Sequence, residues 1–345
     1  YTLAADDPGV VYLSTATLIK PVDGVFTWKD ENYLLPDFWG GIIQANSTDF
    51  LEHRRGVAFM PFTASNNASS FNDCAFASTT GYAGITMWNV KNVKITNCRF
   101  EAQHLDDGYL RRGIRSIDAN PEIENCKFYG NKYGLEVHST FSFVSDPIKV
   151  HNKCNFSKGG STFNGISHIY SNGVIGLDVK DCQFNEGIRG IQISGNSSFD
   201  IERNVLVGYS NYGLDLTNTY SRFKELFANY FYSSSNGSSG IRTWGRNNEF
   251  QFISNCFNHP RNDVYINPVP LFDDQGSRSE SNNNYFHTYN NDGPELFSRL
   301  PKFNYWVPNP SPNPRAIPHC HFLTPKPDAT CTAGYSLHSN IDAFT

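Results

Sequence analysis

Four side chains capable of chemistry lie close together in the sequence: Arg115, Asp118, Glu136 and His138. They belong to two successive phrases in which Gly is followed by Ile or Leu. A pair of carboxylates could carry out acid–base hydrolysis of a glycosidic bond. A basic residue beside carboxylates, aided by calcium, could instead abstract a proton from an acidic sugar. The same residues also fit a structural interpretation, with Arg115–Glu136 and Asp118–His138 as charge pairs on a solvated sheet.

Residues between and after the apolar positions of the Gly-Ile phrases should point outward and form two columns. The first column reads Thr86, Arg115, Glu136, Ser167, Gln192, Asp215 and Arg242. The second reads Trp88, Asp118, His138, Tyr170, Ser194, Thr217 and Trp244. Flat aromatic rings beside polar groups suit stacking and hydrogen bonding along a sugar chain. The ligand-binding candidates are therefore Trp88, Tyr170, Asp215, Arg242 and Trp244.

The elements that would position these residues come from a repeat. A polar residue, often Asn, is followed by Cys or an aromatic residue and then by Phe, as in Asn97-Cys98-Arg99-Phe100. The second position of this phrase falls at residues 74, 98, 126, 154, 182, 205, 230, 256 and 285. The Gly-Ile phrases interleave with it, and an alternating run such as Val93-Lys94-Ile95 precedes it.

Each period of about 25 residues thus holds three short strands, which predicts an all-β, right-handed parallel β-helix with three-strand coils. We expect about nine to eleven coils. The Asn before Cys fits a bend that needs a left-handed backbone, and the Gly before Ile is expected to serve a second bend. A propeller or a leucine-rich solenoid fits the repeat less well.

Three regions follow from this pattern. Residues 1–45 are expected to form N-terminal opening coils. Residues 46–290 form the β-helix body, with an irregular insertion at 46–70. Residues 291–345 change character, because eight of the 18 prolines lie between Pro301 and Pro327. Proline cannot donate to a strand ladder, so this last region is predicted to be a capping or linker segment with a preference for the cap.

The cysteines divide into two groups. Cys74, Cys98, Cys126, Cys154, Cys182 and Cys256 occupy one repeat position and are predicted to be a buried ladder of free thiols. Cys320 and Cys331 lie outside the repeat, where a disulfide is one of two open alternatives.

No cofactor is expected from the sequence. A metal at His319-Cys320-His321 is disfavoured, because the two His would face away from the Cys on a strand. Calcium at Asp106 and Asp107 or at Asp273-Asp274 is the weaker alternative to ordinary turns.

Composition excludes some classes of partner. The net charge is −5, and no run of Lys and Arg goes beyond a pair, so a nucleic-acid partner is disfavoured. No apolar stretch reaches the roughly 20 residues of a membrane span. Because the chain begins at Tyr1, we interpret it as a piece of a longer precursor.

The repeats resemble those of large secreted right-handed β-helix proteins of Bacteroidota-type bacteria. Trp39-Gly40-Gly41-Ile42 is similar to their first coil, and Asn255-Cys256-Phe257, Asp263-Val264-Tyr265-Ile266 and Asp273-Asp274-Gln275-Gly276 are similar to their closing coils. The resemblance implies secretion or display at the cell surface in association with the outer membrane. It also implies export by the type IX secretion machinery, although no sorting domain is evident.

Catalytic β-helix families match less well. Polygalacturonases pair an Asp-Asp motif with Gly-His-Gly, and here Asp106-Asp107 has no such partner. We therefore expect a non-catalytic module for adhesion, glycan binding or scaffolding, with a polysaccharide or another cell-surface component as partner. The alternative is a polysaccharide lyase or glycoside hydrolase that acts in a groove on the Gly-Ile strand face.

Overall fold

The computed structural model describes most of the chain between residues 42 and 267. The described ranges are 42–51, 57–59, 69–78, 82–102, 112–140, 147–158, 166–195, 197–217, 224–235, 237–244, 251–253, 255–258 and 262–267, with short strands at 18–19, 25–27, 37–38, 285–286 and 305–306. Every regular element in these ranges is a β-strand. The chain divides into two compact units, 1–174 and 175–345.

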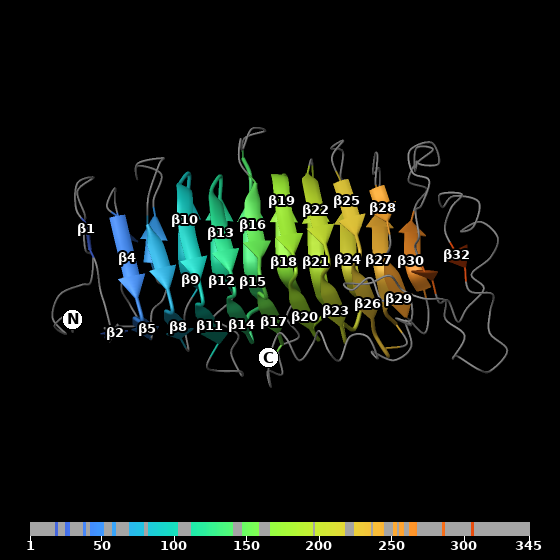
Figure 1. Ribbon diagram of the computed structural model, residues 1–345, viewed down its shortest axis with the longest axis horizontal. Coiled ribbons are helices and arrows are strands. Elements are labelled where there is room, and N and C mark those ends of the chain that lie inside the picture. Colours follow the sequence, from blue (N-terminus) through green and yellow to red (C-terminus); the bar gives the residue numbers. More distant parts are fainter. Residues whose placement is uncertain are drawn as a thin grey trace. The chain divides into compact units, whose positions relative to one another are not determined.

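Three parallel sheets run through the first unit (Figure 1). Its first sheet contains β1 (Leu18–Ile19), β4 (Ile42–Asn46), β7 (Ser70–Asn72), β10 (Lys91–Thr96), β13 (Asn120–Glu124) and β16 (Ile148–His151). Its second sheet contains β2 (Val25–Thr27), β5 (Asp49–Leu51), β8 (Ala75–Ser78), β11 (Arg99–Ala102), β14 (Lys127–Tyr129) and β17 (Asn155–Ser157). Its third sheet contains β3 (Asp37–Phe38), β6 (Val57–Phe59), β9 (Ala83–Trp88), β12 (Arg112–Ile117), β15 (Tyr133–His138) and β18 (Ser167–Asn172).

The second unit repeats this plan. Its first sheet contains β19 (Ile175–Lys180), β22 (Ser198–Glu202), β25 (Lys224–Phe227) and β28 (Gln251–Ile253). Its second sheet contains β20 (Gln183–Asn185), β23 (Val205–Val207), β26 (Tyr230–Tyr232), β29 (Cys256–Asn258), β31 (Tyr285–Phe286) and β32 (Tyr305–Trp306). Its third sheet contains β21 (Arg189–Ser194), β24 (Tyr212–Thr217), β27 (Ser239–Trp244) and β30 (Asn262–Asn267).

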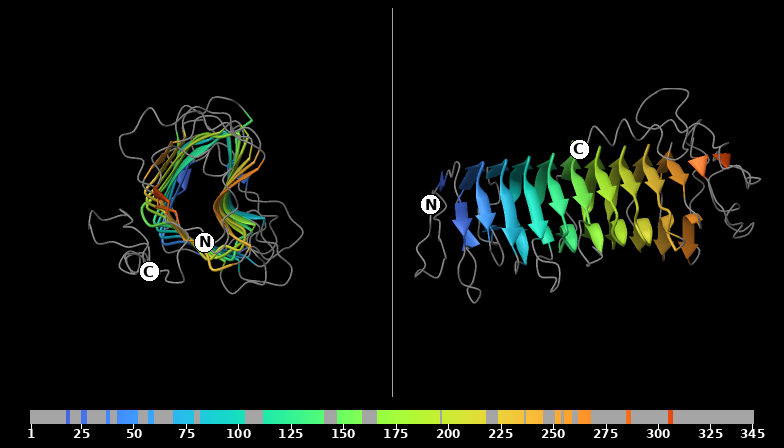
Figure 2. Two further views of the ribbon diagram at one scale, coloured as in Figure 1. Left: turned by 90° about the vertical axis from the view of Figure 1, so that its right-hand side faces the viewer. Right: turned by 90° about the horizontal axis from the view of Figure 1, so that it is seen from below.

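Within the first unit, strands pair in parallel with their counterparts one coil later, so β10 pairs with β13, β11 with β14 and β12 with β15. Figure 2 shows these strands in parallel rows along the first unit, from blue to green. The predicted all-β fold with three strands per coil is confirmed. The coil number and the proline-rich cap stay predictions.

The corner between the first and second sheets is left-handed, as expected. Asn97 and Asn125 have φ values of 57° and 49°, and short polar side chains tolerate this region. The Asn97 amide donates to the Glu124 carbonyl of the next coil at 3.1 Å. The inter-coil ladder therefore continues through the bend.

A ladder of buried thiols follows this corner in the first unit. Cys74, Cys98, Cys126 and Cys154 are buried and unbridged, as predicted. The Cys126 amide lies 3.5 Å from Cys154 Sγ, and that thiol lies 3.6 Å from the Ile123 carbonyl. Burial raises the pKa of Cys126, so its thiol stays protonated and unreactive.

The predicted place of Cys256 in this ladder is wrong. In the second unit Gln183 pairs with Val205, and Tyr230 pairs with Cys256. The position of the buried Cys182 is therefore taken in later coils by Asn204, Asn229 and Asn255.

These asparagines form a ladder of their own. Asn204 Oδ1 accepts from the Cys182 amide at 2.9 Å, and Asn204 Nδ2 donates to the Val179 carbonyl at 2.8 Å. Asn229 makes the same two contacts one coil later. The side-chain carboxamide of Asn204 thus satisfies the same pair of backbone groups as the Cys154 thiol does in the first unit, and its hydrogen bonds are stronger.

Phenylalanine rings fill the core of the first unit. Phe50, Phe76, Phe100, Phe128 and Phe156 stack face to face, with centroids 4.4 to 4.9 Å apart and planes within 7° of parallel. Each ring belongs to the second sheet, and the rings face the glycines of the third. An added Cβ on Gly134 would lie 2.6 Å from the Phe156 ring.

The expected role of the Gly-Ile glycines at a bend is therefore wrong. Gly84, Gly113 and Gly134 lie within β9, β12 and β15, and they are absent from the left-handed residues. Glycine stands there because a phenylalanine ring occupies the space of a side chain.

Two strands lie inside the range 46–70 that we expected to be irregular. β5 pairs with β8, and β6 pairs with β9. These strands are parts of a coil, because the aromatic Phe50 and Phe59 supply inward-facing residues that are fully buried.

Replacing Gly134 by Ala should lower the free energy of unfolding by about 1–3 kcal/mol, since the new methyl group overpacks the core against Phe156. Urea unfolding would measure this change. Gly237→Ala is the matched control, because its nearest neighbour would be the Ser210 carbonyl at 3.9 Å. Equal stability of the two variants would contradict the close packing.

Candidate functional site

The outer face of the third sheet in the first unit presents two rows of side chains. Strand register places Thr86, Arg115, Glu136 and Tyr170 in the first row. It places Trp88, Ile117, His138 and Asn172 in the second. Successive members of a row lie about 4.8 Å apart, which is the spacing of neighbouring strands. Six side chains on this face, Trp88, Arg112, Arg115, Glu136, His138 and Tyr170, are called the Trp88 face below.

The predicted columns needed two corrections. Tyr170 belongs to the row of Glu136, and Ser167 lies opposite Tyr133 instead. The prediction took Ile166 of the Gly165-Ile166 phrase as the residue opposite Leu135, but that residue is Ile169. The buried His168 therefore stands where β9, β12 and β15 have glycine.

Asp118 also lies outside its predicted column, where Ile117 stands between Trp88 and His138. The polar Ser116 turns inward between Met87 and Val137, and its hydroxyl donates to the Ala119 carbonyl at 2.9 Å. Asp118 lies in the turn after β12, where its backbone is left-handed with a φ of 49°. Its carboxylate accepts a hydrogen bond from the Thr140 amide at 2.7 Å and also accepts from the Ser139 and Thr140 hydroxyls.

Glu136 is the centre of the charged groups on the Trp88 face. Arg112 donates to both carboxylate oxygens, through Nε to Oε2 and through Nη2 to Oε1 at 3.1 Å. Arg115 Nε lies 3.5 Å from Oε2, and His138 Nε2 lies 3.2 Å from Oε1. Sequence reasoning brought Arg115, Glu136 and His138 together correctly but missed Arg112, whose only signal was its place in the Arg111-Arg112 pair.

This environment decides the ionisation of Glu136. Burial alone would raise the pKa of its carboxyl, but hydrogen bonds from His138 and Arg112 outweigh burial and lower the pKa to about 2. Only 8% of the side chain is exposed. A carboxylate held ionised in this way balances charge within the sheet, and it is poorly suited to donate a proton.

Aromatic rings surround the charged groups. The Arg112 guanidinium lies 4.3 Å from the Tyr82 ring centroid, and that of Arg115 lies 5.5 Å from the same ring. The His138 and Tyr170 rings meet edge to face at 5.6 Å. Trp88 remains 40% exposed, so a flat apolar ring is available to a ligand.

The second unit contains a related cluster, in which a buried carboxylate is paired with two arginines. Asp215 is fully buried and accepts two hydrogen bonds from Arg242, at 2.7 and 2.6 Å. Arg189 Nε lies 2.9 Å from the same carboxylate, and the Arg242 guanidinium covers the Tyr212 ring at 4.2 Å. The predicted ligand residues Asp215 and Arg242 are thus partners of each other. The Trp244 side chain lies outside the described residues.

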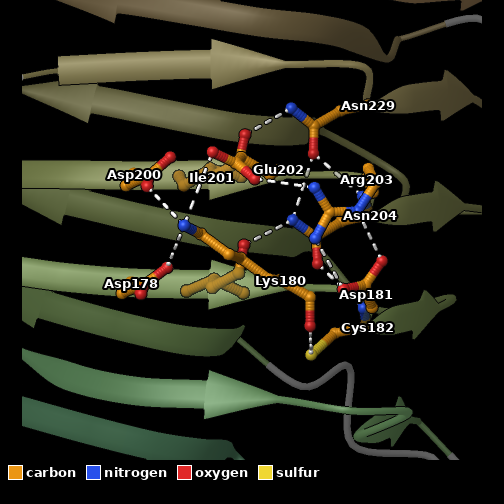
Figure 3. A network of polar contacts seen from close by, with 11 residues as sticks. Asp178, Lys180, Asp181, Cys182, Asp200, Ile201, Glu202, Arg203, Asn204 and Asn229 are labelled. Carbon is orange, nitrogen blue, oxygen red and sulfur yellow. Dashed lines mark hydrogen bonds and ion pairs between the residues drawn. The ribbon is translucent and has the colours of Figure 1, made fainter.

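The first sheet of the second unit holds a further network that sequence reasoning missed (Figure 3). Lys180 Nζ lies 2.6 Å from Asp200, 3.3 Å from Asp178 and 3.4 Å from Glu202. The only signal was the alternating run Leu177-Asp178-Val179, which placed these residues on the outer face. The three carboxylates surround one ammonium group.

Crowding of charge perturbs Asp200. Burial raises the pKa of its carboxyl, the Lys180 hydrogen bond opposes this, and the nearby Glu202 and Asp178 raise it further, to about 6. Directly after these strands, Arg203 donates two hydrogen bonds of 2.8 Å to Asp181. Lys180 and Arg203 thus supply two positive charges to the four carboxylates of the network, Asp178, Asp181, Asp200 and Glu202.

Within the described ranges, no three His, Cys, Asp or Glu side chains are placed to hold a metal ion. The calcium candidates Asp106, Asp107 and Asp273-Asp274 and the segment from His319 to Cys331 lie outside those ranges. No helix long and apolar enough to cross a membrane occurs in the part of the chain that was searched.

This fold and this outer face define a class: a parallel β-solenoid that presents polar and aromatic rows on a flat sheet. The family model for a right-handed β-helix region matches residues 62–257, which is more than half of the chain. The chain therefore belongs to the right-handed β-helix family, whose members are often carbohydrate-active or carbohydrate-binding. Comparison with curated proteins and with solved structures gives no match.

Replacing Glu136 by Gln should lower the free energy of unfolding at pH 7 by about 3–5 kcal/mol, because Arg112 would keep a largely buried charge without its partner. Urea unfolding would measure this. Glu122→Gln removes a partly exposed carboxylate 3.7 Å from two lysines and should cost less than about 1 kcal/mol. Equal losses would contradict the structural role of Glu136.

Stability should also depend on pH through Asp200. Its folded pKa of about 6 exceeds the ordinary value of about 3.9, so the folded state binds more protons between these pH values. The contribution of Asp200 to stability therefore falls as pH rises from about 4 to about 6. Asp200→Asn should therefore make the melting temperature depend less on pH over this interval, in thermal unfolding measured from pH 4 to 7.5. An unchanged dependence on pH would contradict the raised pKa of Asp200.

Proposed function

We propose that this protein is a non-catalytic module that binds a glycan chain across the Trp88 face. The observation that carries the proposal is the exposed ring of Trp88, in register with His138 and close to the Arg115 and Tyr170 row. Sugar rings pair an apolar face with hydroxyl groups, so flat aromatics flanked by hydrogen-bonding side chains suit them.

The regular spacing of the coils supports a polymeric ligand. Each row offers one side chain per coil at about 4.8 Å intervals, so successive sugars can meet equivalent positions. Trp88 and His138 stand two coils apart in one row, with Ile117 between them. This apolar and polar mixture over three coils supports binding of several sugars in line.

Binding without cleavage is favoured by the state of the two carboxylates. Glu136 is ionised and held by Arg112, and the Asp118 carboxylate accepts hydrogen bonds from Ser139 and Thr140. Both would have to leave these contacts to act as acid, base or nucleophile on a glycosidic bond.

The same proposal places the module outside the cell or at its surface, where it would bind a polysaccharide or another surface component and serve in adhesion or scaffolding. The resemblance of the repeats to secreted β-helix proteins supports this location. Export through the type IX machinery is part of the proposal, and it rests on that resemblance alone.

The test compares two exposed aromatic residues. Trp88→Ala should weaken glycan binding by about tenfold or more, because the ring supplies the stacking surface. Tyr129→Ala is the matched control, since Tyr129 is 46% exposed but belongs to the second sheet. Affinity electrophoresis in gels containing neutral and acidic polysaccharides would measure retardation of both variants and of the unaltered protein.

Two outcomes would overturn the proposal. Equal retardation of Trp88→Ala and Tyr129→Ala, whether binding is kept or lost in both, would show that binding does not depend specifically on the Trp88 ring. Shortening of the polymers during incubation, abolished by Glu136→Gln in a variant that still folds, would favour the lyase or hydrolase alternative. We expect polymer length to stay unchanged.

A further inference from the structure

We infer that the glycan bound on the Trp88 face is acidic and that one of its carboxylate or sulfate groups pairs with Arg115. This inference rests on the proposed function and specifies the chemical class of the ligand. It comes from a count of charges and hydrogen-bond donors around Glu136.

The charges around Glu136 do not balance. The guanidinium groups of Arg112 and Arg115 both approach this one carboxylate, and His138 adds a third basic group at 3.2 Å. Among the six side chains of the Trp88 face, two guanidinium groups thus share one carboxylate, because the neighbouring Asp118 carboxylate is bound by Ser139 and Thr140 in the following turn. This local surplus of positive charge stands on a chain whose net charge is −5. A positive patch on an acidic protein attracts anions selectively.

The hydrogen-bond donors show which cation is available. Arg112 gives two hydrogen bonds to Glu136. Arg115 lies within ion-pair distance of Glu136, but its buried Nε donates no hydrogen bond to any described residue. Arg112 Nη1 is likewise buried without a described partner, but Arg112 already holds both oxygens of Glu136. The neighbouring Thr86 hydroxyl, opposite Arg115 in the strand register, is also buried without a hydrogen-bond partner in the described residues.

Arg115 remains accessible, with 29% of its side chain exposed. Its Nε is buried, so a ligand would meet the exposed remainder of the side chain, and carboxylate and sulfate oxygens match the N–H groups of a guanidinium. A neutral sugar hydroxyl would leave the excess charge uncompensated.

The cluster in the second unit shows the alternative state of such an arginine. Arg242 gives two hydrogen bonds to Asp215 and a third contact of 3.5 Å to the Tyr212 hydroxyl. Its donors are used within the protein. Arg242 and Arg115 therefore differ in the number of acceptors that the chain supplies. Arg189 Nε in the second cluster also lacks a hydrogen bond, but it lies 2.9 Å from Asp215, whereas Arg115 Nε lies 3.5 Å from Glu136, and we place the ligand anion at the exposed part of Arg115.

The experiment uses matched polymers that differ only in charge: polygalacturonate with its methyl-esterified form, and dextran sulfate with dextran. Dissociation constants are measured for the unaltered protein, Arg115→Gln, Arg115→Lys, Arg99→Gln and Trp88→Ala. Arg99 is the control, because it is an exposed arginine of the same unit on the second sheet. Thermal unfolding confirms that each variant is folded.

The unaltered protein should bind at least one acidic polymer about tenfold more tightly than its neutral partner, the equivalent of one charge-assisted hydrogen bond. Arg115→Gln should lose this preference, Arg115→Lys should retain part of it, and Arg99→Gln should stay within about twofold. Preference for polygalacturonate alone assigns a carboxylate ligand, and preference for dextran sulfate alone assigns a sulfate.

The outcomes separate this inference from the proposed function. Equal binding of charged and neutral polymers, lost in Trp88→Ala but kept in Arg115→Gln, would overturn the acidic ligand and leave glycan binding intact. If Arg115→Gln and Arg99→Gln lose the preference for the acidic polymer equally, that preference comes from net charge alone, and the site at Arg115 is overturned. Absence of binding to every polymer would overturn both.

Discussion

The stacking of each coil on the next is the constraint from which the rest of this structure follows. Because paired strands are parallel and in register, each inward side chain must pack against the residue at the same position one coil away. Phenylalanine meets this condition in the first unit, where rings stack 4.4 to 4.9 Å apart. The ring column in turn excludes side chains from the facing strands, which explains the glycines at Gly113 and Gly134.

Buried polar groups face the same constraint at the corner after the first sheet. Backbone groups that turn there need partners, and the chain provides them with a side chain from the next coil. Cys154 does so in the first unit and Asn204 in the second. A thiol and a carboxamide are similar enough in size to occupy one position. Their exchange shows that the position requires a small acceptor and donor, with no requirement for thiol chemistry.

On the outer face, stacking brings charges from neighbouring coils within reach of each other. Glu136 and Asp215 are both preceded by a Tyr-Gly-Leu sequence, and both are neutralised by arginines from neighbouring coils. Burial of each carboxylate is tolerated because guanidinium groups satisfy it. The two clusters differ in one arginine. Arg242 donates two hydrogen bonds to its carboxylate, whereas Arg115 Nε donates none to a described residue. A structural motif of the solenoid thus acquires a potential for binding where one cation has too few acceptors.

The sequence by itself determined the fold class, because a repeat of about 25 residues with period-two strands admits few architectures. It also determined the buried thiols from Cys74 to Cys182, although not the position of Cys256, and the left-handed corners at Asn97 and Asn125. Strand register was decided only by the tertiary structure, since a shift of one residue reverses the direction of every side chain. Ser116 turns inward while Ile117 stays outside, and Ile169, not Ile166, faces Leu135. Contacts between coils, such as Arg112 with Glu136, depend on that register, and no local pattern of residue types specifies it.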